Sequence, residues 1–189
     1  MSVMTVMVLL ARITILGAAA WAAVVDVRER VVPYTAMALV AASGVLIRLL
    51  TPHDHVWPSV VGAFVVFVAL SLLAGAGVFG GGDAKLIAAA ALGIAPQDIV
   101  PLLLEIALAG GALACVYLIG RRLMRERAAD AGGKGDARGP GALACLLRTE
   151  AARMGAREPM PYAVAIFAAL LWRTTPEVVR CLSSGSCSP

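Results

Sequence analysis

The stretch Gly80-Gly81-Gly82-Asp83-Ala84-Lys85 stands between two apolar runs, residues 60–79 and 86–95. A carboxylate at such a membrane boundary is costly, about 2.5–3.5 kcal/mol at the centre of a membrane helix, and ionisable groups at these places are functional candidates. The three glycines carry no β-carbon, so another backbone can come close and turn geometries closed to other residues become available. We therefore expect a polar site around Asp83, and a single aspartate calls for a second acid or base elsewhere.

The composition is that of an integral membrane protein. Of the 189 residues 60% are hydrophobic and 15% charged, with a mean hydropathy of +0.87, whereas soluble domains are about half apolar and a quarter charged. The length allows one membrane-embedded domain, residues 1–189, with no second domain of ordinary size. The net charge of +4 does not indicate nucleic-acid binding, because the basic residues cluster between apolar runs.

The apolar runs predict an all-α bundle of about six transmembrane helices, since a span needs about 20 apolar residues. The expected spans are residues 3–25, 33–50, 59–79, 84–95, 99–120 and 160–179, with one long polar loop at about 121–159. Arg12 interrupts the first span and either snorkels or faces a partner helix. The fourth span would rise only about 18 Å, so Asp83 and Lys85 are expected in a water-filled cleft below the membrane surface.

The lysine and arginine distribution predicts the orientation. With the amino terminus outside, 12 of the 16 basic residues face the cytoplasm: Arg28, Arg30, Lys85 and nine in the long loop. Both termini are therefore expected outside. Asp26, at the inner end of the first span, and Asp83, at the inner end of the third, then lie at the same depth.

Two carboxylates at one boundary can share a proton, because two like charges a few ångströms apart do not both ionise cheaply. One can act as general base on water while the other, protonated, polarises a carbonyl. This is the chemistry of an aspartic protease, which uses no metal and no cofactor. The simpler interpretation of Asp26 alone is a helix-end charge paired with Arg28 or Arg30.

Other polar groups carry weaker signals. The glycine stretch lacks the spacing of a phosphate-binding P-loop. His53, Asp54 and His55 form a weak metal motif that is better explained as a solvated loop. Glu105, in the fifth span, is expected to be a buried hydrogen-bonding group or an interfacial charge.

Three motifs together resemble the type IV prepilin peptidase family, membrane aspartic proteases of the GxGD type. Residues 26–33, Asp-Val-Arg-Glu-Arg-Val-Val-Pro, resemble the family's first-aspartate motif, and residues 80–86 match its G-x-G-D-x-K-L motif. Residues 160–166, with Pro161 and Tyr162, resemble the opening of its last span. One departure is Tyr34, where the family often has asparagine.

The resemblance implies that Asp26 and Asp83 are the catalytic pair, supported by Gly80, Gly82, Lys85, Arg28, Pro33, Pro161 and Tyr162. It implies cleavage of the leader peptide of pilin-like precursors at the cytoplasmic face of the bacterial inner membrane. The lipid bilayer and the precursor are then the partners. The sequence lacks the paired C-x-x-C motifs of the longer, bifunctional members, so the methyltransferase activity of those members is in doubt for this chain, which resembles the short Flp/Tad-type members.

Two other functions fit the same carboxylates or the same architecture. A small proton- or cation-coupled transporter could use Asp26, Asp83 and Glu105, and a non-catalytic subunit of a secretion machine would need none of them. Both aspartates at one face, rather than at mid-bilayer, favour the protease. At the carboxyl end, Cys181 and Cys187 would lie outside, where disulfides persist. A disulfide between them and two free thiols are both open, while Cys115 and Cys145 are expected to stay reduced.

Overall fold

The computed structural model describes residues 3–51, 56–77, 80–130 and 161–184. Within these residues it is all-α: α1 (Val3–Glu29), α2 (Tyr34–Leu50), α3 (Val56–Gly75), α4 (Gly81–Leu92), the short 3₁₀ helix η1 (Pro96–Asp98), α5 (Ile99–Asp130) and α7 (Tyr162–Ser184). Among the residues that the structure describes, three helical stretches are long and apolar enough to cross a membrane: Val3–Glu29, Val56–Gly75 and Pro96–Gly120. The expectation of an all-α membrane protein is confirmed.

The helix bounds differ from the expected spans in an informative way. α1 continues through Asp26 to Glu29, and α5 continues through the first polar residues of the expected loop to Asp130. Polar residues end the membrane-crossing part of a segment, but Arg, Leu, Met, Glu and Ala are good helix formers and do not end the helix. Asp26 therefore lies inside the last turn of α1. The rest of the expected loop, residues 131–160, lies outside the described residues.

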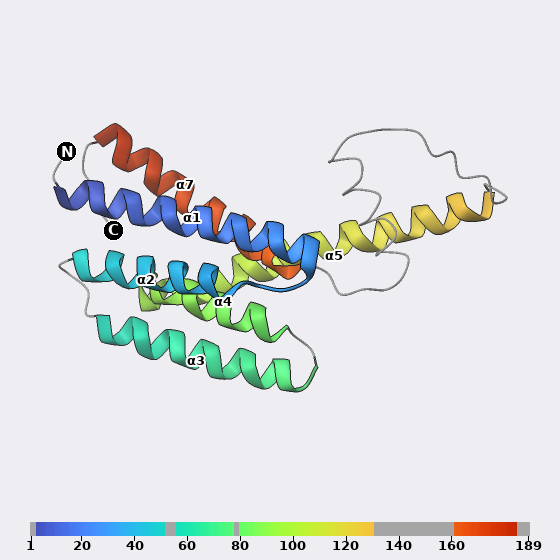
Figure 1. Ribbon diagram of the computed structural model, residues 1–189, viewed down its shortest axis with the longest axis horizontal. Coiled ribbons are helices and arrows are strands. Elements are labelled where there is room, and N and C mark those ends of the chain that lie inside the picture. The colour runs from blue at the N-terminus through green and yellow to red at the C-terminus, as the bar shows by residue number, and fades with distance from the viewer. Residues whose placement is uncertain (1–2, 52–55, 78–79, 131–160, 185–189) are drawn as a thin grey trace. The chain divides into compact units, whose positions relative to one another are not determined.

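The chain divides into two units, Met1–Ala109 with Pro161–Pro189, and Gly110–Met160. In the first unit α1 packs against α2 and α7, and α4 packs against α2 and α3 (Figure 1). All the candidate site residues belong to this unit. The described part of the second unit is the continuation of α5.

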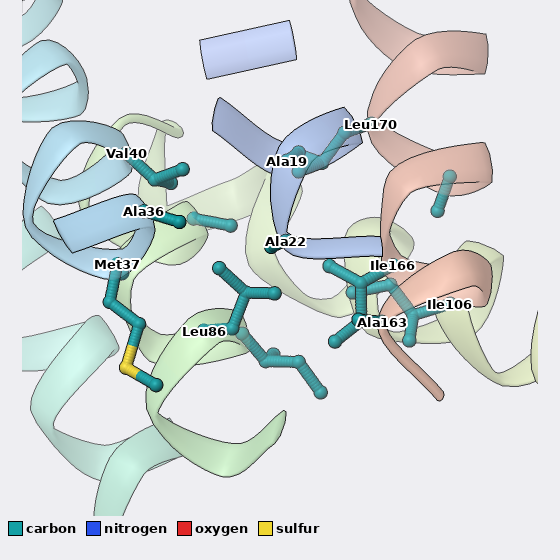
Figure 2. Close-up of a cluster of buried hydrophobic side chains, with 14 of the residues drawn as sticks. Ala19, Ala22, Ala36, Met37, Val40, Leu86, Ile106, Ala163, Ile166 and Leu170 are labelled. Atoms are coloured by element: carbon teal, nitrogen blue, oxygen red, sulfur yellow. The ribbon is translucent and has the colours of Figure 1, made fainter. Parts of the chain in front are cut away.

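The core of the first unit is rich in alanine. Figure 2 shows Leu86 of α4 among side chains of neighbouring helices, with Ala19 and Ala22 of α1 and Ala36 of α2 close by. Small residues allow helix backbones to approach closely, which is the main source of packing energy between helices in lipid. This core joins the carboxyl end of α1, the start of α2 and the start of α4.

A pair of glycines brings α2 and α4 into backbone contact. A β-carbon built on Gly44 would lie 2.8 Å from the Cα of Gly93, and one built on Gly93 would lie 2.8 Å from the Cα of Gly44. Gly93 follows the last residue of α4. The contact therefore fixes where α4 ends along α2.

Candidate active site

Asp26 is held by the way α1 ends. Arg30, just past the helix, adopts a left-handed conformation with φ 57° and donates its backbone N–H to the carbonyl of Asp26 at 3.0 Å. A left-handed residue directly after a helix is a common way to terminate it. The chain then turns into Pro33 and α2, and Asp26, only 7% exposed, points into the protein.

The first turn of α7 meets Asp26 from the other side. The backbone N–H of Ala163 donates a hydrogen bond of 3.1 Å to Oδ2 of Asp26. Free N–H groups at a helix amino terminus stabilise negative charge. Pro161 directly precedes this turn, and its carbonyl accepts a hydrogen bond from Val164 at 3.2 Å. The motif at residues 160–166 thus places a helix terminus on the carboxylate.

Asp83 lies in the first turn of α4, and Gly80 occupies the position just before the helix. The Asp83 side chain folds back over this glycine, since a β-carbon built on Gly80 would lie 2.5 Å from its Oδ2. The other carboxylate oxygen, Oδ1, is buried and makes no hydrogen bond within the described part of the chain. Gly80 thus gives the carboxylate the space it occupies.

The two aspartates are brought to the same end of the first unit. The charge of Asp26 acts on Asp83, and the charge of Asp83 acts in turn on the phenol of Tyr162. Three helices, α1, α4 and α7, therefore contribute one polar side chain each to a single cluster, which we call the aspartate end. The arrangement can hold one shared proton between two carboxyl groups.

Of the remaining glycines of the motif, only Gly82 allows a close approach, and neither makes an unusual turn. Gly81 and Gly82 are helical, and among the described residues only Arg30 and Gly77 have positive φ. A β-carbon built on Gly82 would lie 3.3 Å from the Cβ and Cγ2 of Val32, whereas Gly81 has nothing within 4 Å. The turn geometries that these glycines would allow are not used here, whereas the close approach that they also allow is present at Gly82. Gly82 instead lets the residues that follow α1 pack on the start of α4.

Lys85 lies two residues after Asp83, about 200° around the helix, and it contacts the other motif. Its ammonium nitrogen lies 5.1 Å from the centre of the Tyr34 ring, which is a cation–π distance. Sequence reasoning treated Tyr34 only as a departure from the family pattern and missed this contact. An aromatic residue one position after Pro33 and a lysine in the second motif were the signals that could have found it.

The other candidates lie elsewhere. Arg28 is exposed on the last turn of α1. Glu105, whose side chain is 28% exposed, accepts a hydrogen bond from Arg173 at 3.1 Å, which agrees with a hydrogen-bonding role in a partly buried place. His53, Asp54 and His55 lie outside the described residues, and within those residues no group of three His, Cys, Asp or Glu side chains could hold a metal ion.

The family comparison agrees with this geometry. The type IV leader peptidase family matches residues 13–115, which is more than half of the chain and includes both aspartates. The chain belongs to the type IV leader peptidase family. Neither a curated protein nor a solved structure gave a match. The matched region ends before α7, so the contact of α7 with Asp26 is a finding of the structure alone.

Proposed function

We propose that this type IV leader peptidase is an aspartic endopeptidase that cleaves leader peptides from pilin-like precursors, with Asp26 and Asp83 as its catalytic pair. What supports this most is that two carboxyl groups separated by 57 positions of sequence lie near enough for the charge of Asp26 to act on Asp83. Both lie in the turns where α1 ends and α4 begins. Membership of the leader peptidase family supplies the substrate class.

The geometry supports a division of roles. The N–H of Ala163 stabilises negative charge on Asp26, so Asp26 is the base that takes a proton from water. The water oxygen attacks the scissile carbonyl carbon, and protonated Asp83 donates its proton to the carbonyl oxygen. When the tetrahedral intermediate collapses, Asp26 gives the proton it took from water to the amide nitrogen, the C–N bond breaks and the nitrogen leaves as the new amino terminus, while a hydroxyl of the intermediate returns a proton to Asp83. The leader keeps the new carboxyl group.

The supporting residues have positioning roles in this proposal. Gly80 leaves room for the Asp83 carboxylate, Gly82 seats α4 against Val32, and Pro161 and Tyr162 begin the helix that contacts Asp26. Lys85 and Tyr34 tie the two motifs together. The transporter alternative uses Glu105 as a third carboxylate beside Asp26 and Asp83. Glu105 pairs with Arg173 instead, which counts against that alternative.

The experiment is cleavage of a co-expressed pilin precursor, followed by the shift of the precursor band. Asp26→Asn and Asp83→Asn should each abolish cleavage while membrane insertion is unchanged, and the double variant should lose no more, because the two residues act as a unit. Glu29→Gln is the matched control, since Glu29 is an exposed carboxylate three residues from Asp26. Near-normal cleavage by either single asparagine variant would contradict the pair.

The proposal also places the aspartate end at the cytoplasmic face of the inner membrane, with both termini in the periplasm. The leader of a precursor lies in the cytoplasm before cleavage, so the catalytic pair has to face that side. Reporter fusions should then place Gly133 inside and His53 outside. A reporter at Gly133 that is active only outside would separate the pair from its substrate and overturn the orientation.

A further inference from the structure

A second polar centre lies in the first unit, away from the two aspartates. A cavity of about 380 Å³ opens where α1, α2, α7 and the turn between α4 and α5 meet. We call it the arginine cavity. Its charged lining residues are Arg12, Arg48, Asp98, Arg173 and Glu177.

The cavity follows from the shortness of α4. Gly93, the residue after α4, packs on Gly44 of α2, but α2 continues to Leu50, about 9 Å further. Beyond this contact α2 has no α4 beside it, and the chain turns through residues 95–98 instead. The space is thus built into the relative lengths of the two helices.

The arginines of this cavity are the ones that the membrane orientation does not explain. Twelve of the 16 basic residues fall on the expected cytoplasmic side, and the other four are Arg12, Arg48, Arg173 and Arg180. Three of these four, from three different helices, line the same cavity. A charged group inside a membrane bundle is costly and is a functional candidate by default.

The charges are layered. Arg12 and Arg48 are only 6% and 4% exposed, whereas the side chains of Glu177 and Asp98 are 42% and 45% exposed. Carboxylates that are close to half exposed are screened by water. The deep part of the cavity is therefore positive and its mouth is negative.

The guanidinium groups have donors to spare. Arg173 contacts Asp98 at 2.9 Å and Glu105 at 3.1 Å. Arg12 approaches Glu177 with Nη1 at 2.7 Å, but the approach lacks hydrogen-bond geometry, and this buried nitrogen makes no hydrogen bond to any described residue. Each guanidinium carries five N–H donors, so the ion pairs leave donors for a ligand.

We propose that the arginine cavity binds a phosphate group, held by Arg12, Arg48 and Arg173. The planar fork of a guanidinium matches two phosphate oxygens, which makes arginine the preferred residue for this anion. The group comes either from the headgroup of a phospholipid or from free phosphate. Trp57, 74% exposed in the first turn of α3, a helix that contacts η1, favours the lipid, because tryptophan is enriched at headgroup depth.

The test uses the purified full chain in an uncharged detergent and follows its thermal unfolding. Three probes are compared: phosphatidylglycerol, a diacylglycerol with the same chains and no phosphate, and sodium phosphate against sodium chloride at equal ionic strength. A ligand that binds only the folded state raises the unfolding temperature, by about 5 °C or more well above its Kd. Stabilisation by phosphatidylglycerol but not diacylglycerol identifies a headgroup site, and stabilisation by sodium phosphate over chloride identifies a free-anion site.

Variants show whether the effect belongs to the cavity. Arg48→Lys keeps the positive charge but loses the fork, so it should weaken the stabilising ligand at least about tenfold while the protein still folds. Arg173→Lys, which is less buried, gives a second reading if Arg48→Lys unfolds. Arg180→Lys is the matched control, since Arg180 is exposed on the same helix as Arg173. The proposal is overturned if neither phosphate probe stabilises the protein, or if the cavity variants and the control respond alike.

Discussion

The substitution Gly80→Ala should move the Asp83 carboxylate while leaving the stability of the fold nearly unchanged, so it tests whether the position of that carboxylate matters for catalysis. A β-carbon at Gly80 would lie 2.5 Å from Oδ2 of Asp83. To reach an ordinary contact of at least 3.4 Å, the oxygen has to retreat by about 0.9 Å. The backbone at Gly80, with φ −74° and ψ 129°, suits alanine, so the side chain moves and the main chain does not.

The expected effect is therefore large on activity and small on stability. Carboxylate rotation and the replacement of glycine before the helix should cost about 1 kcal/mol of folding free energy or less. A misplacement of about 1 Å at a reacting group costs on the order of 100-fold in rate. Cleavage of a purified precursor should thus fall by about that factor while the unfolding temperature moves by a few degrees at most.

Gly81→Ala is the matched control, because a β-carbon at Gly81 meets nothing within 4 Å. It lies one residue further along the same helix start and should cleave the precursor at close to the normal rate. If Gly80→Ala cleaved as fast as Gly81→Ala, the position of the Asp83 carboxylate over Gly80 would not matter for catalysis. If both lost activity equally, the glycines would act through the helix start and not through the carboxylate.

Two further predictions concern the bundle and its last helix. Gly93→Ala should destabilise the protein by about 1–3 kcal/mol, as overpacking does, because its β-carbon would lie 2.8 Å from the Cα of Gly44. Chemical unfolding in detergent measures this loss, with Gly111→Ala as the control, because a β-carbon at Gly111 meets nothing within 4 Å. If the two variants were equally stable, the contact between Gly93 and Gly44 would be refuted. Cys181 is buried on α7 and disulfide-bonded, so it should react with a maleimide only after the protein is unfolded and reduced. The exposed free thiol of Cys115 should react in detergent without unfolding or reduction. Labelling of Cys181 in unfolded but unreduced protein would show that the disulfide is absent.

That disulfide bears on a question the sequence left open. Cys181 is bonded, and its partner lies outside the described residues. Pairing with Cys187 stays a prediction, as does the reduced state of Cys145, which also lies outside those residues. Spacing alone did not decide between a bond and free thiols, since a glycine-containing segment of five residues permits both.

Several features of the fold could be predicted from the sequence because they depend on local composition. Runs of about 20 apolar residues predict spans, and the first motif closes one span while the second opens another. An even number of crossings between Asp26 and Asp83 puts both at the same face. The ends of the helices were less predictable, because polarity ends a span at Val25 or Gly120 while helix propensity carries α1 to Glu29 and α5 to Asp130.

The sequence by itself determined the class of protein and predicted the two aspartates and their common side of the bundle, because hydropathy and charge act over a single helix. Tertiary structure alone decided what surrounds them. The backbone N–H of Ala163 donates a hydrogen bond to Asp26, which is 137 positions away in the sequence, and Val32 packs on Gly82. The arginine cavity likewise needs side chains from separate helices, brought together by where α4 stops against α2. Such contacts depend on how closely helices pack, and no local pattern of residues encodes that distance.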